Sequence, residues 1–197
     1  MDIDFVRQKL IAHATDSSTA AVPGHAAVAV VLRQGERSAE ILLIERAHRE
    51  GDPWSGHMAF PGGRVESSDR STCVTARRET LEEVGLDLAR AEHLGQIDEL
   101  TGNPRRRPRL VVTAHAFHLA ENQELALCAA EVRSAFWFPL ADMLEESRRV
   151  EYVFRKNPGV QYPGVLVGVP DRHVVWGMTY RFLDTLFGRL GHSLRTR

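Results

Sequence analysis

The sequence predicts an α/β protein in which a mixed β-sheet lies between helices. A chain of 197 residues is long enough for one well-buried domain and short for two. Its composition, with 43% hydrophobic and 26% charged residues, is ordinary for a globular protein. Strand-like apolar runs and helical segments are interleaved without the regular βαβ period of a parallel sheet, which favours a mixed sheet.

The N-terminal part predicts a helix and then three strands. Apolar residues recur at roughly helical spacing in "DIDFVRQKLIAH" (2–13), and "STAAVPGH" (18–25) follows as a linker. Two apolar runs, 26–35 and 39–47, are rich in Val, Ile and Leu and flank a polar turn that contains glycine, which predicts a strand pair. A third strand is expected at 57–60, ended by Pro61, Gly62 and Gly63.

A polar helix is predicted next. Ser71 or Thr72 is suited to its N-cap, and Gly85 suits the residue just past its C-terminal end. Val74, Leu81 and Val84 cluster on one side of this helix, so we expect that side to face the core.

The C-terminal half predicts further strands and a closing helix. Strands are expected at 92–100, 109–119 and 132–140, a short helix at 140–147, and strands at 149–154, 164–169 and 173–178. An amphipathic helix at 179–190 ends the fold. We expect three parts: an N-terminal helix and linker (1–22), the main domain (23–192) and a tail (193–197).

Composition excludes several functional classes. The net charge of −1 gives no global field for nucleic acid or an anionic membrane. No run approaches the ~20 apolar residues of a membrane span, and the N-terminus carries acids where a signal peptide carries basic residues. Cys73 and Cys128 form neither a disulfide framework nor a metal-finger spacing, which fits a reducing compartment. A cytoplasmic protein is expected.

The predicted polar helix concentrates acids in one arc. Glu79, Glu82 and Glu83 stand at spacings i, i+3 and i+4, and Arg78 lies one turn before Glu82 and can pair with it. Two interpretations are open. The arc can be a solvated face with an internal ion pair, or it can be a cage for divalent cations.

The glycine pair favours the cation cage. Two glycines let the backbone approach a ligand closely, and the loop after Gly63 can bring its carbonyl beside the carboxylates. Mg²⁺ prefers carboxylates, carbonyls and water, with substrate phosphate completing the shell. Hydrolysis of a phosphoanhydride needs this arrangement, since a metal neutralises phosphate charge and activates water.

The segment "GGRVESSDRSTCVTARRETLEEVGL" (62–86) resembles the Nudix box of Nudix hydrolases. That pattern is Gly, five residues, Glu, seven residues, then Arg-Glu-apolar-any-Glu-Glu-any-Gly-apolar. "RETLEEVGL" matches it closely, with Thr80 at the usual aliphatic position. Counting from Gly63, the first acid is Asp69 rather than Glu, and the run to Arg78 is one residue longer.

Both departures resemble the coenzyme A diphosphatase branch of that family. Segments 42–47, 55–63 and 174–186 also resemble this branch. Its upstream signature is matched in part, by Leu42, Leu43, Arg46, Ala47, Gly56 and Phe60. The interval from Arg46 to Gly56 is one residue too long, and Arg49 is nearest to the arginine expected within it. The resemblance implies a Nudix-fold α/β/α sandwich.

The resemblance also implies roles for the charged residues. The Mg²⁺ or Mn²⁺ ligands would be Glu79, Glu82 and Glu83, assisted by the Gly63 carbonyl. Arg78 would orient these carboxylates by a salt bridge.

Two further acids have roles by the same resemblance. Asp69 would replace the first acid of the box in a lesser, partly structural role. The general base would be Glu83 or Glu131, and a strand-edge or helix-cap charge is the alternative for Glu131.

Other residues are candidates for substrate binding. "GNPRRRPR" gathers four guanidinium groups that can bind phosphate or remain solvated: Arg105, Arg106, Arg107 and Arg109. Trp54 can stack on a nucleobase or pack beneath the sheet, and Arg46 can contact phosphate or pair with an acid.

The remaining polar residues indicate no other chemistry. His57, His115 and His118 lack the spacing of a zinc site and are expected to be structural or exposed. Ser55 and Ser67 have no readable His/Asp arrangement that would support a serine nucleophile.

The function expected from these features is a metal-dependent diphosphatase acting on a small nucleotide, coenzyme A or a related compound. Rival substrates are ADP-ribose, a nucleotide sugar or a dinucleotide. A Nudix-fold sensor that binds a nucleotide without cleaving it is the rival from another class. No nucleic-acid or membrane partner is expected, and a homodimer is left open.

Overall fold

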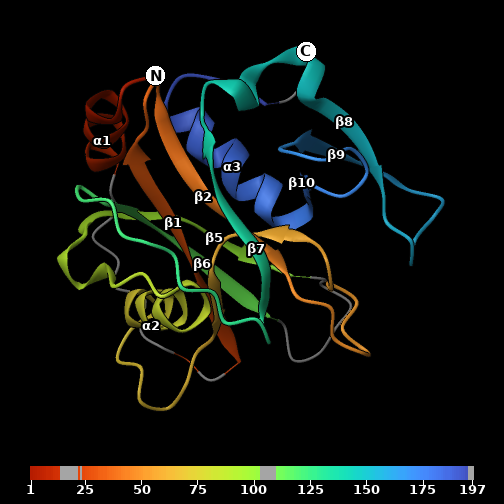
Figure 1. Cartoon of the computed structure of the whole chain (residues 1–197), viewed down its shortest axis with the longest axis horizontal. Helices are drawn as coiled ribbons and strands as arrows, with labels where there is room; N and C mark the ends of the chain where they lie inside the picture. The colour runs from red at the N-terminus through yellow and green to blue at the C-terminus, as the bar shows by residue number, and fades with distance from the viewer. Residues whose placement is uncertain (14–21, 23, 103–109, 195–197) are drawn as a thin grey trace.

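The computed structural model describes residues 1–13, 22, 24–102 and 110–194. Within these residues it contains a seven-stranded sheet, a separate three-stranded sheet and three α-helices (Figure 1). Most of the expected linker at 18–25 lies outside the described residues.

The main sheet is mixed, as predicted. Its strands are β1 (His25–Gln34), β2 (Ala39–Arg46), β3 (Met58–Ala59), β4 (Gly62–Arg64), β5 (Glu92–Thr101), β6 (Val111–His118) and β7 (Val132–Pro139). The order is β3-β2-β1-β6-β5, while β4 also pairs with β1 and β7 with β2. Only the β1–β6 pair is parallel among the described strands; the others are antiparallel.

The central strands are buried on both faces. Along β1, Val30 and Leu32 belong to one hydrophobic cluster, and Ala29 and Val31 belong to another on the opposite face. Successive side chains of a strand point to opposite faces, so a continuous apolar run suits a strand covered on both sides.

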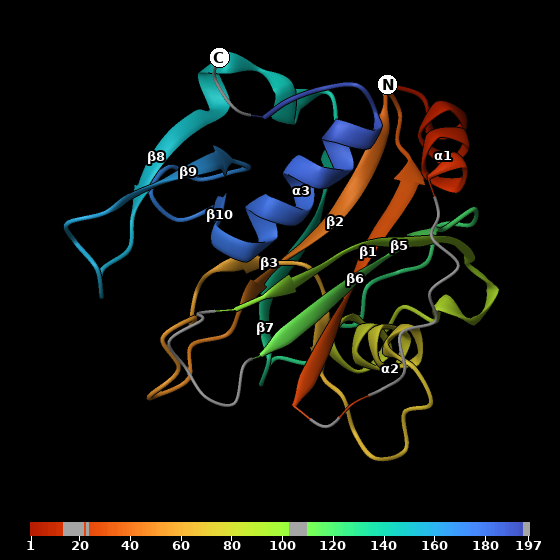
Figure 2. The ribbon, with the colours of Figure 1, turned by 180° about the vertical axis from the view of Figure 1, so that it is seen from behind.

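Helices cover each face of the sheet. The N-terminal helix α1 (Ile3–Ala12) and the C-terminal helix α3 (Gly177–Arg189) contribute to the first cluster. Helix α2 (Thr72–Val84) contributes to the second. Figures 1 and 2 show α3 and α2 on opposite sides of the strands, so the predicted α/β/α sandwich is confirmed.

A small antiparallel sheet packs against α3 and reaches β3. It contains β8 (Arg149–Val153), β9 (Gln161–Leu166) and β10 (Val174–Trp176) in the order β10-β9-β8. Strands β8 and β10 lie within the runs predicted at 149–154 and 173–178, whereas β9 begins and ends three residues before the predicted 164–169.

The predicted helix at 140–147 is wrong. Two 3₁₀ turns, η2 (Asp142–Leu144) and η3 (Glu146–Arg148), occupy this segment, and a further turn, η1 (Leu88–Arg90), follows α2. Met143 is the only buried residue in η2, and η3 has none. Within 140–147 only Leu140, which follows β7, and Met143 are buried, and this is too little tertiary packing to hold a full α-helix.

The N-terminal helix is part of the main core. Ile3, Val6 and Leu10 are buried in the same cluster as the residues of α3. The division into 1–22, 23–192 and 193–197 stays a prediction. Among the described residues, no helix is both long enough and apolar enough to cross a membrane.

Candidate active site

Helix α2 begins and ends where the sequence predicts. Ser71 is its N-cap, and the Ser71 side chain accepts a hydrogen bond from the Val74 N–H at 3.3 Å. Gly85 is its C-cap in the left-handed conformation, with φ of 72°. A side chain there would also meet Ala126, because an added Cβ would lie 2.7 Å from the Ala126 Cβ. The two caps therefore fix the ends of α2, and with them the face that the helix turns toward the sheet.

The rotation of α2 differs from the predicted one. Val74 is 41% exposed and Leu81 is 50% exposed, whereas Val84 is buried as expected. The buried positions of α2 recur every three to four residues and include polar ones: Thr72, Thr75, Ala76, Thr80, Glu83 and Val84. The prediction assumed that the apolar residues mark the core face, but here the face with the acids turns toward the sheet.

The buried threonines remain hydrogen bonded. Thr75 Oγ1 donates to Asp69 at 2.9 Å, and Thr80 Oγ1 donates to the Ala76 carbonyl at 2.7 Å. A buried hydroxyl costs free energy mainly when it lacks a partner. Thr80 is therefore accommodated at a position where the Nudix pattern usually has an aliphatic residue.

Gly62 and Gly63 bring the backbone against α2, and each has its own reason to be glycine. They form strand β4, which pairs with β1, instead of ending the preceding strand. A Cβ on Gly62 would lie 2.3 Å from the Ala27 carbonyl oxygen, at a φ of 153°. A Cβ on Gly63 would come within 2.5 Å of the Glu79 carboxylate oxygens. The glycine pair thus leaves room for one carboxylate beside the chain.

Three carboxylates converge at this point. Potential ligand oxygens of Glu79, Glu83 and Glu131 all lie within 4.8 Å of one another, and we call these residues the carboxylate cluster. Glu79 and Glu83 are one turn apart on α2. Glu131 directly precedes β7, whose pairing with β2 places it beside Ala47. Glu83 is 3% exposed and accepts a hydrogen bond from the Gly62 N–H at 2.9 Å.

Burial raises the pKa values of two of these acids, Glu79 and Glu83. Burial raises the pKa of Glu83 to about 7, and the neighbouring charges of Glu79 and Glu131 add to this. Burial likewise raises the pKa of Glu79. Like charges held close together in a partly buried site favour either protonation or a cation. Carboxylate oxygens are the ligands that Mg²⁺ and Mn²⁺ prefer, so this donor set fits a hard divalent ion.

Glu82 lies apart from the carboxylate cluster. Its side chain is 55% exposed and pairs with Arg78 at 2.9 Å, which is the ion pair the sequence predicts. It is not among the three mutually close acids found in the described residues. Of the three acids predicted as metal ligands, Glu79 and Glu83 lie in the carboxylate cluster, and Glu131 is its third member.

Arg78 links the carboxylates to the preceding loop. Its guanidinium contacts Asp69 through two nitrogens, at 3.1 and 3.0 Å, and Glu79 at 3.0 Å. Asp69 also accepts from the Glu66 N–H. Hydrogen bonds from Arg78 lower the pKa of the buried Asp69 to about 2. Asp69 therefore anchors the loop and Arg78, which fits the structural role implied for it.

The candidate substrate contacts have different surroundings. Arg46 pairs with Asp52 at 3.0 Å, while its Nε is buried without a hydrogen-bond partner. Trp54 is 48% exposed and stacks on Phe154, with ring centroids 5.4 Å apart. The residues Arg105, Arg106, Arg107 and Arg109 lie outside the described residues.

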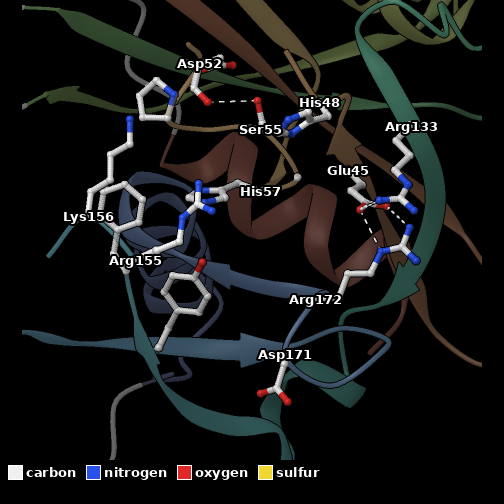
Figure 3. Close-up of a pocket in the computed structure, with 14 residues that line it drawn as sticks. Glu45, His48, Asp52, Ser55, His57, Arg133, Arg155, Lys156, Asp171 and Arg172 are labelled. Carbon is white, nitrogen blue, oxygen red and sulfur yellow. Dashed lines mark hydrogen bonds and ion pairs between the residues drawn. The ribbon is translucent and has the colours of Figure 1, made fainter. Parts of the chain in front are cut away.

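A cavity of about 370 Å³ lies next to this region (Figure 3). On one side, buried Glu45 pairs with Arg172 at 2.7 Å and with Arg133 at 3.6 Å. Arg155 and Lys156 lie across from them in Figure 3, and neither forms an ion pair within the described chain. The cavity therefore offers two cations without an acidic partner.

The cavity shares a loop with the carboxylate cluster. His48, Asp52 and Ser55 line the cavity, and the same loop carries Arg49, which pairs with Glu131 at 2.8 Å. His57 also lines it and lies edge-on to Phe154; burial lowers the pKa of His57 to about 4. His57 is therefore a neutral wall residue, in agreement with a structural role.

Sequence reasoning did not find this cavity. Arg155 and Lys156 follow a short strand in "EYVFRKNPG", and such a charged pair before Asn-Pro-Gly is typical of a solvent-exposed turn. The sequence predicts Phe154 only as the last residue of a strand, with no role in a cavity. No local pattern indicated that β8 would lie opposite the loop around Ser55, because that approach depends on the second sheet.

Comparison with known proteins identifies the fold and the family. A NUDIX domain matches residues 23–156. Human mitochondrial coenzyme A diphosphatase NUDT8 is 30% identical over 172 residues, which cover 87% of this chain and 71% of that protein. The uncharacterized protein C14C4.10c of Schizosaccharomyces pombe is 49% identical over 109 residues, covering 53% of this chain and only 33% of that protein.

A solved structure agrees with these relatives. The crystal structure of a MutT/nudix family protein from Enterococcus faecalis matches with a TM-score of 0.58 and 19% identity, over 91% of this chain and 66% of that chain. At this identity the likeness concerns the fold. The domain match covers most of the chain and includes α2, the helix that holds Glu79 and Glu83. The chain belongs to the Nudix hydrolase family.

Proposed function

We propose that this protein is a metal-dependent hydrolase that cleaves the diphosphate linkage of a nucleoside diphosphate derivative, namely coenzyme A or a closely related compound. The carboxylate cluster is the observation that carries the proposal. Three acids within 4.8 Å of one another favour a bound cation, and two of them lie on α2. The relationship to a human protein named as a coenzyme A diphosphatase supports the substrate.

The chain's own groups divide the work. Glu79 and Glu83 would hold Mg²⁺ or Mn²⁺, with the Gly63 carbonyl as a further ligand. Glu82 would join them only by turning away from Arg78. A bound divalent ion would neutralise diphosphate charge and lower the pKa of a water molecule. Arg78 fixes the orientation of Glu79 through its hydrogen bond. Attack of water on phosphorus breaks one P–O anhydride bond, and the phosphate on the other side leaves.

Glu131 is our candidate for the group that accepts the proton from this water. Its side chain is 40% exposed, so it can reach a solvent molecule, and it lies within 4.8 Å of both other acids. Glu83 is the alternative base. Its carboxylate is buried and accepts the Gly62 N–H, whereas the more exposed Glu131 accepts a hydrogen bond from Arg49. A base must be within hydrogen-bond reach of the proton that it removes.

The cavity in Figure 3 is our candidate for the substrate's nucleotide. Arg155 and Lys156 provide positive charge for a phosphate group, and Phe154 and Tyr152 provide aromatic faces. Coenzyme A carries a 3′-phosphate that ADP-ribose and dephospho-coenzyme A lack. The two cations therefore supply a physical reason to prefer coenzyme A among nucleoside diphosphate derivatives.

A substrate panel tests the proposal. The protein is incubated with Mg²⁺ or Mn²⁺ and with coenzyme A, ADP-ribose, UDP-sugars or dinucleoside polyphosphates. We expect hydrolysis of coenzyme A that stops when EDTA removes the metal. Binding without turnover of any compound would support the sensor and overturn the enzyme. A preference for ADP-ribose would overturn the choice of coenzyme A while leaving the hydrolase intact.

A paired substrate tests the role of the cavity. The double variant R155A/K156A should raise KM for coenzyme A by roughly 10-fold, which corresponds to the loss of charge-assisted hydrogen bonds to one phosphate. KM for dephospho-coenzyme A should change little. Arg37→Ala, at an 82% exposed side chain between β1 and β2, is the matched charge control. Equal changes in KM for both substrates would contradict the proposal that the 3′-phosphate binds in this cavity.

The expected cytoplasmic location and the homodimer stay predictions. Gel filtration of the purified chain decides the second, and neither affects the chemistry proposed for the carboxylate cluster.

A further inference from the structure

Cys73, His93 and His115 meet on the α2 side of the sheet, and we call them the thiol–imidazole cluster. Cys73 is the second residue of α2, His93 lies on β5 and His115 on β6. One potential ligand atom of each residue lies within 4.8 Å of those of the other two. The sequence separates them by about twenty residues each time, so no local spacing indicates this grouping.

The facing ring nitrogens of the two histidines are about as far apart as two nitrogen ligands of one zinc ion. His93 Nε2 and His115 Nδ1 are 3.2 Å apart, and the ring planes are inclined by 46°. A tetrahedral ion with Zn–N bonds of 2.0–2.1 Å holds two nitrogens roughly 3.3 Å apart. The Cys73 thiol needs a shift on the order of 1 Å to complete three ligands at Zn–S and Zn–N distances.

A hydrogen bond fixes the inner histidine. His115 is 1% exposed, and its Nε2 lies 2.9 Å from Thr72 Oγ1. With Nε2 engaged by the hydroxyl, Nδ1 is the nitrogen directed toward His93. Histidines that bind metals almost always use their other ring nitrogen for such a contact, which orients the ring and selects the tautomer.

The charge state of the cluster also suits a metal. Burial lowers the pKa of His115 to about 4 and lowers that of His93, so both rings are neutral at neutral pH. Burial raises the pKa of the Cys73 thiol, and the nearby positive charge of Arg77, together with its hydrogen bond, partly offsets this. The same charge also lowers the pKa values of both histidines. A bound ion displaces the remaining thiol proton. With sulfur and nitrogen ligands and no carboxylate, the cluster disfavours Mg²⁺.

We propose that the thiol–imidazole cluster binds one Zn²⁺, or a divalent ion of similar softness, through Cys73 Sγ, His93 Nε2 and His115 Nδ1. His93 is exposed, so water can complete a tetrahedral shell. The bound ion connects the first turn of α2 to β5 and β6. It is independent of the carboxylate cluster, which takes a hard ion at the other end of the same helix.

Cobalt is the probe for this site, because thiolate-bound tetrahedral Co²⁺ absorbs strongly. The full chain is stripped of metal, returned to excess Mg²⁺ to fill the carboxylate cluster, and titrated with Co²⁺. We expect one Co²⁺ per chain with a thiolate-to-cobalt charge-transfer band in the near ultraviolet, displaced by Zn²⁺. Absence of a charge-transfer band in the wild-type chain would overturn the proposal.

Three variants locate the ion. Cys73→Ser and His93→Gln should abolish the band or weaken Co²⁺ binding by at least ~100-fold, since loss of even an outer-shell partner costs 10–100-fold. Cys128→Ser, which removes the other cysteine, should retain the band. His93 is exposed, so His93→Gln removes one ligand without disturbing the core. Retention of the band in both cluster variants, or its loss in Cys128→Ser, would contradict the assignment.

Discussion

Helix α2 carries the carboxylate cluster near its C-terminal end and the thiol–imidazole cluster near its N-terminal end. The first gathers like charges, and burial with mutual repulsion raises the pKa of Glu83 to about 7. The second gathers groups that are neutral at neutral pH, since burial lowers the pKa of His115 to about 4. Without a metal the first cluster is electrostatically strained, whereas the second is satisfied by hydrogen bonds. The first cluster therefore favours protonation or a bound cation, whereas the second needs neither.

The largest effect should come from the carboxylate cluster itself. Glu83→Gln keeps the acceptor for the Gly62 N–H but removes the charge that we propose to hold the metal. We expect kcat to fall by at least ~100-fold, the scale of lost metal-assisted or acid–base catalysis. Steady-state kinetics with saturating Mn²⁺ measures this. Turnover like that of the wild-type chain would contradict the ligand assignment.

The second effect separates the two glycines beside that cluster. In Gly63→Ala the new methyl group meets the movable end of Glu79, so the carboxylate must leave its place. We expect activity to fall by roughly 10- to 100-fold, as for a displacement of about 1 Å, with little change in stability. Gly62→Ala is the matched comparison, because its methyl group meets the backbone of β1. That variant should instead lower the urea unfolding midpoint. The opposite pattern would contradict the assigned roles.

Sequence alone predicts those parts of the molecule whose interactions are local. The caps of α2 at Ser71 and Gly85 follow from side-chain type and backbone freedom within a few residues. The double-sided burial of β1 and β2 follows from their continuous apolar runs. Glu79 and Glu83 share an arc of the helix by spacing alone.

Sequence does not predict features that depend on how distant elements meet. The rotation of α2 was misjudged because Val74 and Leu81 are apolar, yet β4 and the loop at Asp69 cover the opposite arc. The cations Arg155 and Lys156 gain a cavity only because the second sheet faces the loop before β3. Cys73, His93 and His115 come from a helix and two strands whose pairing no local spacing encodes.

The third effect is a pH response of opposite sign in the two clusters. Glu83 has a folded pKa of about 7, above its ordinary 4.5, so the folded chain binds more protons between these values. Its contribution to stability therefore rises as pH falls from 7 to 4.5. His115 has a folded pKa of about 4, below its ordinary 6.5, so the unfolded chain binds more protons between these values. Its contribution falls as pH drops from 6.5 to 4.

Urea unfolding in EDTA at several pH values separates these contributions. Each group changes the free energy of unfolding by at most ~1.4 kcal/mol per pH unit. The stability that Glu83→Gln gains over the wild-type chain should be larger at pH 8, where Glu83 is charged, than at pH 5, where Glu83 is already protonated. His115→Gln should gain relative stability as pH falls from 7 to 5. If the free energy of unfolding of either variant changed with pH in parallel with that of the wild-type chain, the pKa shift of the replaced group would be contradicted.

The smallest effect should be that of Cys73→Ser on hydrolysis. Cys73 lies on α2, but the carboxylate cluster is held by Gly62, Gly63 and Arg78 near the other end of the helix. The N-cap bond of Ser71 keeps the first turn in place without a metal. We therefore expect kcat in Mg²⁺ to change by less than about 2-fold, well below the effect of losing a catalytic contact. Assay of the metal-stripped chain with Mg²⁺, with and without added Zn²⁺, measures it. A fall comparable to that of Glu83→Gln would mean that the two clusters act as one site, because only then would an ion at the first turn of α2 be needed for chemistry at its last.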